Sequence, residues 1–231
     1  MSGHPLMPHP RLWAWAFAIV FTAAASVPAQ MDQGLARAQQ ENARALMKYE
    51  WKSRTEVRKD GETKKVQVEA VRYDVGGTQQ KTTISATPEP DLPKFGIRKA
   101  IAKNKLKDFR ETIAGLAALA KSYSELPPDQ MRQFMATAAI TPELTAQHRL
   151  VRIAGGNVLQ QGDSMTVFVD AGSRRQRRIE IQTMFETKPV RIVCEFQDLP
   201  GGPTYMARSH VAYDGDSIAI ITENFDYIRI A

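Results

Sequence analysis

The chain has 231 residues, of which 43% are hydrophobic and 24% are charged, and its formal net charge at pH 7 is +6. This composition is typical of a soluble globular protein, and it excludes both a disordered chain and a protein with many membrane-spanning helices. A chain of this length can bury a sizeable hydrophobic core, so we expect a single domain.

Residues 1–29 have the pattern of a secretory signal peptide. Arg11 precedes an apolar run of 14 residues, Leu12 to Ala25, and small residues follow, with Val27 and Ala29 at positions −3 and −1 of a cleavage site. The run is shorter than the roughly 20 residues that span a bilayer as a helix. We therefore expect cleavage after Ala29 and a periplasmic or secreted domain over residues 30–231. An uncleaved N-terminal anchor is the alternative.

Cys194 is the only cysteine of the chain. A single thiol cannot form an internal disulfide, so the fold must rely on its core even in an oxidising compartment. No cysteine follows the apolar run, which excludes a lipid anchor on a cysteine at that site. Because Cys194 lies in a strand-like run, a buried and inert thiol is favoured over a reactive one.

The first third of the domain predicts a helix followed by a β-hairpin. Residues 32–49 have apolar side chains at helical spacing, whereas residues 51–58 alternate between apolar and polar side chains as a half-buried strand does. Asp60-Gly61 indicates a turn, and residues 66–70 give the returning strand. A third short strand is expected at residues 81–85, before a run of prolines ends the sheet.

Residues 93–144 predict a helical insertion bounded by prolines. Its first helix has an apolar stripe formed by Ile101, Phe109, Ile113, Leu116, Ala120 and Tyr123. Pro127-Pro128 begins a second helix, because proline is tolerated in the first turn. The apolar residues of the second helix are Met131, Phe134 and Met135, and Pro142 ends the section.

The last section predicts seven short strands joined by tight polar turns. The expected strands are residues 148–153, 164–169, 178–185, 190–196, 205–213, 217–222 and 225–230. Short strands at roughly ten-residue spacing indicate an antiparallel meander. The whole order predicts an α+β fold in which helices cover one face of an antiparallel sheet. The strand patterns fit a flat sheet with one solvated face and equally a strongly curved sheet, an incomplete β-barrel, around a cavity.

The sequence contains no pattern that indicates catalysis or metal binding. His148 and His210 are isolated from other metal-ligand residues, and Asp214-Gly-Asp216 has the composition of a turn. The motifs of nucleophile elbows, phosphate loops, dinucleotide sites and zinc proteases are absent from the printed sequence. We therefore expect neither a cofactor nor catalytic chemistry. A hydrolase with an unrecognised site is a minor alternative.

Two clusters of basic residues are candidates for binding an anionic surface. The first begins the long helix and comprises Arg98, Lys99, Lys103, Lys105, Lys107 and Arg110. The second, Arg174, Arg175, Arg177 and Arg178, lies on a turn between strands. Both fit anionic lipid headgroups or another polyanion. Both also fit a solvated helix face and a charged hairpin tip. Phe109 is the only aromatic residue within these two stretches of sequence, and it belongs to the apolar stripe, which disfavours nucleic acid as a partner.

The order of these elements resembles that of the periplasmic lipoprotein-carrier (Lol-type) superfamily and related outer-membrane lipoprotein-sorting proteins. The similarity lies in the first hairpin (YEWKSRTEVRKDGETKKVQVEAVRYD), the helical insertion, and the strands RRIEIQTMFETKPVRIVCEF and ENFDYIRI. The chain also looks like a group of uncharacterised bacterial exported proteins. The resemblance implies an open, strongly curved antiparallel sheet that helices close around an apolar cavity for acyl chains. It assigns no site residue one by one, and the long basic insertion departs from the compact carriers.

We thus expect a non-catalytic binding protein of the cell envelope that holds a lipid, an acyl chain or another apolar ligand between sheet and helices. Mobile thioether and aromatic side chains near the helical cover are the candidates for the cavity lining. These are Met131, Phe134, Met135 and Met184, and ordinary core packing explains them equally well. The alternative is an envelope scaffold that binds an acidic protein partner through the basic helix.

Overall fold

A computed structural model describes residues 34, 37–88, 97–144, 149–215 and 217–230, so the expected signal peptide lies outside the described residues. A helical segment over residues 37–46 precedes the first strand. The strands are β1 (Tyr49–Lys59), β2 (Glu62–Tyr73), β3 (Gln79–Ala86), β4 (Ala139–Leu144), β5 (Arg149–Gly156), β6 (Ser164–Asp170), β7 (Gln176–Phe185), β8 (Lys188–Asp198), β9 (Thr204–Tyr213) and β10 (Ile218–Arg229). The two long helices are α2 (Ile97–Ser124) and α3 (Pro128–Thr137).

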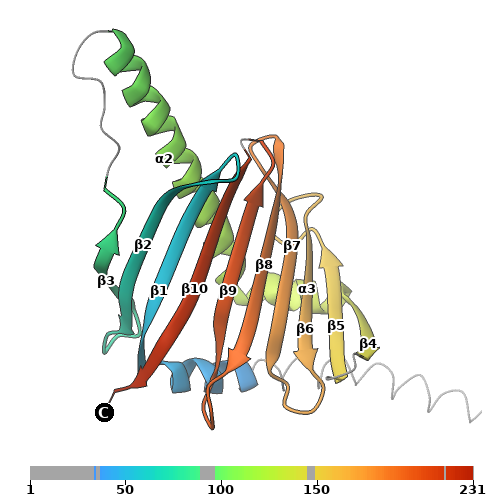
Figure 1. Cartoon of the computed structure of the whole chain (residues 1–231). Helices are drawn as coiled ribbons and strands as arrows, with labels where there is room; N and C mark the ends of the chain where they lie inside the picture. The colour runs from blue at the N-terminus through green and yellow to red at the C-terminus, as the bar shows by residue number, and fades with distance from the viewer. Residues whose placement is uncertain (1–33, 35–36, 89–96, 145–148, 216, 231) are drawn as a thin grey trace, which may run out of the picture.

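All ten strands form one antiparallel sheet in the order β3-β2-β1-β10-β9-β8-β7-β6-β5-β4 (Figure 1). β1 pairs with β10, which joins the N-terminal hairpin to the end of the C-terminal meander. The edge strands β3 and β4 are not paired with each other, so the sheet stays open. The predicted α+β fold, a curved sheet short of a closed barrel with helices against it, is confirmed.

The first hairpin forms where the sequence predicts it. Asp60 and Gly61, between β1 and β2, both have positive φ angles, of 54° and 80°. A two-residue turn of this kind matches the right-handed twist of the paired strands, and it favours Asp or Asn followed by Gly. The sequence Asp60-Gly61 therefore sets the register of the first two strands.

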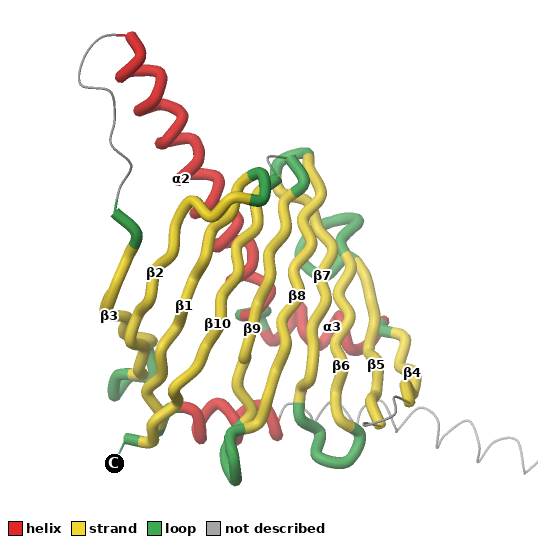
Figure 2. Tube along the Cα trace, viewed as in Figure 1, coloured by secondary structure: helices red, strands yellow, loops and turns green. Residues whose placement is uncertain are grey.

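One face of the sheet, which we call the inner face, lies against α2 and α3, as Figure 2 shows. Residues opposite one another in antiparallel strands point to the same side, so the register defines rows that run across the sheet. One such row is apolar and buried across six neighbouring strands, and we call it the apolar row. Its members are Val57, Ile220, Val211, Ile192, Ile181 and Met165.

α2 covers this row through part of its predicted stripe. Leu116 is fully buried, and Tyr123 is buried beside it in the core. Gly115 allows a close approach, because a Cβ atom there would lie 2.4 Å from Cζ of Phe185 on β7. The stripe was expected to begin at Ile101, but that side chain is half exposed. The reason is that the N-terminal half of α2 extends past the upper ends of the strands (Figure 1).

Two boundaries differ from those predicted. The helical section ends at Thr137 and not at residue 144, because Ala139–Leu144 forms the edge strand β4. Pro142 is accommodated in β4 because an edge strand has one side free of ladder hydrogen bonds. Residues 217–222 and 225–230, expected as two strands, belong to the single strand β10. Glu223 and Asn224, the polar residues between the two expected strands, pair in register with Arg54 and Ser53 of β1, and a bulge near Asp226, whose φ is 53°, follows them.

A smaller aromatic cluster packs at the other end of β1 and β10. Trp51 stacks on Tyr227 with ring centroids 5.4 Å apart, and Tyr205 lies 4.3 Å from Tyr227. The helical segment 37–46 is attached near this end through Asn42. Its side-chain amide donates to the carbonyl of Thr204 at 2.7 Å, and its side-chain oxygen accepts from the Thr204 N–H at 2.6 Å.

Candidate ligand-binding site between the helices and the sheet

The structure brings together three of the four candidate lining residues. Phe134 and Met135 on α3 are buried in the main core, and Met131 is partly buried against it. Met184 on β7 is separate from them and 42% exposed. Its neighbours Thr183 and Phe185 point toward the helices, and successive strand residues alternate in direction, so Met184 points to the outer face.

The floor of the candidate site is the apolar row and its cover is α2 with α3. Leu116 of α2, Ile192 and Ile181 are at most 3% exposed, so the helices and the sheet are in direct contact. The space between them is packed with side chains in this state. An apolar ligand therefore has to separate the helices from the sheet to reach the row.

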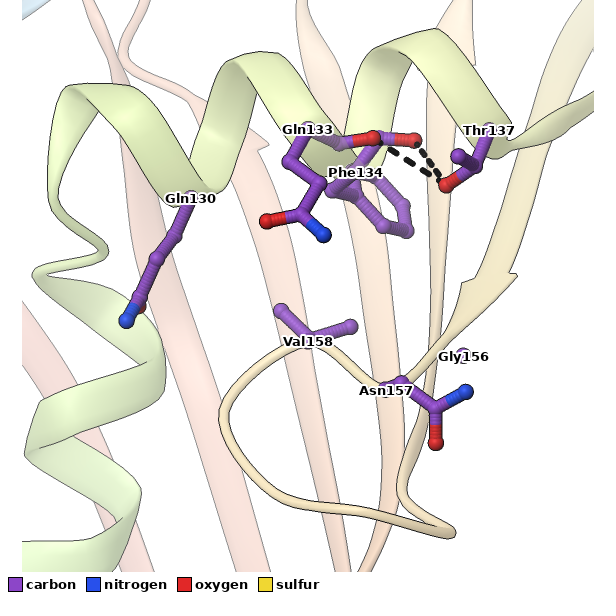
Figure 3. A pocket seen from close by; sticks show the side chains of 7 residues that line it. All are labelled: Gln130, Gln133, Phe134, Thr137, Gly156, Asn157 and Val158. Atoms are coloured by element: carbon purple, nitrogen blue, oxygen red, sulfur yellow. Dashed lines mark hydrogen bonds between the residues drawn. The ribbon is translucent and has the colours of Figure 1, made fainter.

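A pocket of about 260 Å³ lies at one side of this interface, between α3 and the turn that follows β5 (Figure 3). Its lining is mostly polar and consists of Gln130, Gln133, Phe134, Thr137, Gly156, Asn157 and Val158. The side-chain oxygen of Gln130 is buried here without a hydrogen-bond partner. Amide-rich walls suit water or a small polar molecule better than an acyl chain.

A buried polar network, which we call the latch, ties the end of α2 to the sheet. The Tyr123 hydroxyl donates to the Asp163 carboxylate at 2.6 Å and is hydrogen-bonded to the Thr183 hydroxyl at 2.8 Å. Gln160 adds hydrogen bonds from its side-chain amide to the Thr183 hydroxyl and to the carbonyl of Met184. These contacts make the latch the polar part of an otherwise apolar helix–sheet interface.

Asp163 is held in its charged form at the centre of the latch. It accepts backbone N–H groups of Val158 at 2.6 Å, Leu159 at 2.9 Å and Gln160 at 3.0 Å. Burial raises the pKa of Asp163, but the hydrogen bonds from Tyr123 and these N–H groups outweigh it and leave the pKa below its usual value. Burial and the neighbouring carboxylate raise the pKa of Tyr123, which therefore stays protonated.

Toward β1, the inner face becomes polar one row below the apolar row. Thr55, Thr222 and Ser209 stand opposite one another on β1, β10 and β9, and we call them the hydroxyl strip. All three are partly exposed, and the Thr55 and Thr222 hydroxyls are 3.4 Å apart. Cys194 continues this row on β8, where burial raises the pKa of its thiol to about 11. The inner face at β1, β10 and β9 is thus polar between the apolar row and the aromatic cluster around Trp51.

The first basic cluster lies on the projecting half of α2. Lys103, Lys105 and Lys107 are exposed, and Lys107 lies 3.6 Å from Glu111 in an exposed pair. Arg110 is also exposed. Arg98 and Lys99 are within the helix, but their side chains are not among those described.

The second basic cluster is largely neutralised by acidic neighbours. Arg175 and Arg177 both contact the Asp198 carboxylate, at 3.1 Å and 2.9 Å, and Arg178 pairs with Glu180 at 2.7 Å. The turn that carries this cluster joins β6 to β7 at the lower end of the sheet, opposite the projecting half of α2 (Figure 1). The two clusters therefore do not form one surface.

Two further properties of the described residues bear on the site. Within the described ranges, no group of three or more His, Cys, Asp or Glu side chains is arranged to hold a metal ion. Among the same residues, no helix combines the length and the apolar character needed to cross a bilayer.

No protein family and no curated protein matches the sequence significantly. Two solved structures are similar to the chain. A DUF1329 family protein from Desulfovibrio piger ATCC 29098 is 5% identical, with a TM-score of 0.42, over 87% of this chain and 92% of that one. A LolA superfamily protein from Nitrosomonas europaea is 8% identical, with a TM-score of 0.33, over 83% of this chain and 93% of that one. The second of these structures is described as a member of the superfamily that the order of elements in this sequence resembles.

Proposed function

We propose that the chain is a non-catalytic binding protein of the cell envelope that takes up a lipid, an acyl chain or another apolar ligand between the sheet and α2 with α3. The observation that carries this proposal is the apolar row, which crosses six strands beneath two helices. The helices meet this row through apolar side chains and the latch. Such an interface can exchange helix contacts for ligand contacts without breaking the sheet.

The free energy needed to replace helix contacts by ligand contacts favours a ligand with a long apolar chain. Lifting three or four buried side chains such as Leu116 out of the interface costs about 1.5–3 kcal/mol each. An acyl chain of about twelve methylenes contributes about 10 kcal/mol when it is buried in their place. A small apolar molecule does not supply enough surface to offset the same opening.

The non-catalytic part of the proposal is supported by the state of the reactive groups. The Cys194 thiol has a pKa of about 11 and is therefore protonated at neutral pH, and only a thiolate is an effective nucleophile. The Asp163 carboxylate is already occupied by hydrogen bonds from Tyr123 and three backbone N–H groups. The expected signal peptide supports the location in the cell envelope.

The proposal is tested by titrating the purified protein with a dansyl-labelled fatty acid and by native mass spectrometry of the mixture. We expect saturable binding with a blue-shifted emission and a one-to-one complex. Ile181→Thr introduces a hydroxyl into the apolar row and leaves the side chain one heavy atom smaller. Affinity should fall about tenfold, in keeping with the cost of burying an unpaired hydroxyl. Ile84→Thr makes the same change on the exposed strand β3 and should leave affinity unchanged. Absence of both fluorescence change and complex would rule out the proposal.

A further inference from the structure

The net charge of the protein is concentrated in one short segment. Residues 97–111 contain six basic and two acidic residues, so they carry +4 of the total formal charge of +6. The segment is the first half of α2, and it extends past the upper ends of the strands (Figure 1). Among the described residues, the segment that projects past the upper ends of the strands is thus the most basic part.

Two of the exposed lysines face away from the core. Lys103 and Lys107 are four residues apart and therefore lie on one side of the helix, one turn from each other. That side is turned away from Phe109, the first side chain of α2 that packs against the core. Lys105 is also exposed, but it is four residues before Phe109 and lies on the same side of the helix as Phe109. Lys103 and Lys107 consequently form a convex surface along a cylinder and do not line a cleft.

The charges of Lys103, Lys105 and Lys107 are little neutralised by other described residues. The Lys107–Glu111 pair has side chains 70% and 63% exposed, and exposed pairs of this kind contribute at most a few tenths of a kcal/mol. Lys103 and Lys105 form no ion pair with another described residue. The arginines of the β6–β7 turn differ, because Asp198 and Glu180 compensate them.

We propose that the lysine-bearing side of α2 docks the protein on an anionic lipid bilayer. Lysines on a convex, projecting helix suit a flat surface of negative headgroups, since each is a point charge on a flexible stem that can lie along the interface. The proposal deepens the proposed function, because docking would bring the apolar site to a membrane that supplies or receives its ligand.

The expected strength follows from the number of lysines. A lysine near an anionic membrane contributes about 1 kcal/mol, which corresponds to about a fivefold change in partition coefficient. The attraction is screened beyond about 8 Å at physiological ionic strength, so it acts only on side chains close to the surface. Loss of two lysines should therefore weaken binding about 25-fold.

The test is flotation of the purified exported protein with vesicles, at low and at physiological ionic strength. One set of vesicles contains phosphatidylglycerol and phosphatidylcholine in equal parts, and the other contains phosphatidylcholine alone. We compare the wild type with Lys103→Gln/Lys107→Gln and with Lys121→Gln. Lys121 is the matched control, because it is about five turns and roughly 27 Å along the same side of α2 from Lys103 and is likewise exposed.

We expect binding to the anionic vesicles alone, weakened by salt, about 25-fold weaker in the double variant and within twofold of the wild type in Lys121→Gln. Equal binding of all three proteins, or no binding to anionic vesicles at low salt, overturns the proposal. Retention on immobilised polyglutamate without vesicle binding assigns the surface to an acidic polypeptide and also overturns it. Fatty-acid titration of the double variant distinguishes failure of one proposal from failure of the other. Vesicle docking can fail while fatty-acid binding persists, and fatty-acid binding can fail while vesicle docking persists.

Discussion

Two parts of one sheet face differ in chemistry although the strands run through both. Under α2 and α3, the inward positions Ile181, Ile192 and Val211 are apolar and buried. One row below, toward β1, the inward positions Thr55, Thr222 and Ser209 carry hydroxyls and are partly exposed. Strand alternation is the same in both parts, so the difference reflects what lies over the strands. Under the proposed function, the apolar ligand would lie beneath the helices and the hydroxyl strip would border the site.

The largest effect is expected from removing the central contact of the cover. Leu116→Ala should lower the free energy of unfolding by about 2–5 kcal/mol, because the truncation leaves a cavity at a fully buried position. Leu144→Ala makes the same change at a side chain that is 78% exposed, and should change the stability by less than about 0.5 kcal/mol. Urea denaturation measures both. Similar losses for the two variants would mean that α2 does not form the core with the sheet.

The second prediction compares the same substitution in the two parts of the inner face. Thr183→Val removes the hydroxyl that joins Tyr123 and Gln160 in the latch, and should cost about 1–3 kcal/mol because buried partners lose a hydrogen bond. Thr222→Val removes a hydroxyl from the hydroxyl strip, where solvent can replace it, and should cost less than about 0.5 kcal/mol. Thermal unfolding of the two variants decides this. A larger loss at Thr222 would reverse the comparison.

The third prediction concerns the outer face of the sheet, where Glu56 should make the stability of the protein depend on pH. Glu56 has its pKa lowered to about 2 by hydrogen bonds from Arg58, Thr63 and Arg54, in that order of importance. A lowered folded-state pKa stabilises the protein above the unfolded pKa of about 4.5, and this stabilisation is lost as the pH falls from about 5 toward 2. Glu56→Gln should therefore flatten the acid limb of a stability–pH curve. The conservative change Glu50→Gln on the same strand is the control, and an unchanged limb in Glu56→Gln would contradict the assignment.

The smallest effect concerns the thiol at the border of the two parts. Cys194 should react slowly with a maleimide at neutral pH, because burial keeps the thiol protonated with a pKa near 11. If an apolar ligand separates the helices from the sheet, its addition should change the labelling rate. Labelling in denaturant gives the reference for full access. Rapid labelling of the native protein would contradict the raised pKa of the Cys194 thiol.

The sequence predicts the sheet well because alternation along each strand and the turn at Asp60-Gly61 are local signals. The site is predicted less well, because it depends on the direction of single side chains. Residue type groups Met184 with Phe134, yet strand parity turns Met184 to the outer face, whereas its neighbour Thr183 points toward the helices. The latch was not predicted, since Asp163 lies in a polar turn and its partner Tyr123 is 40 residues away in the sequence. The sequence offers one local signal for the latch, because Asp163 follows Gly162 and directly precedes the strand that begins at Ser164.

The most direct measurement is photo-crosslinking of the protein with a fatty acid that carries a diazirine in its acyl chain, followed by residue-level mass spectrometry. If the apolar ligand lies beneath α2 and α3, crosslinks should map to inward residues of the apolar row such as Ile181 and Ile192, and to Leu116 of the cover. Crosslinks confined to outer-face residues such as Met184, or to the hydroxyl strip at Thr222, would contradict that placement.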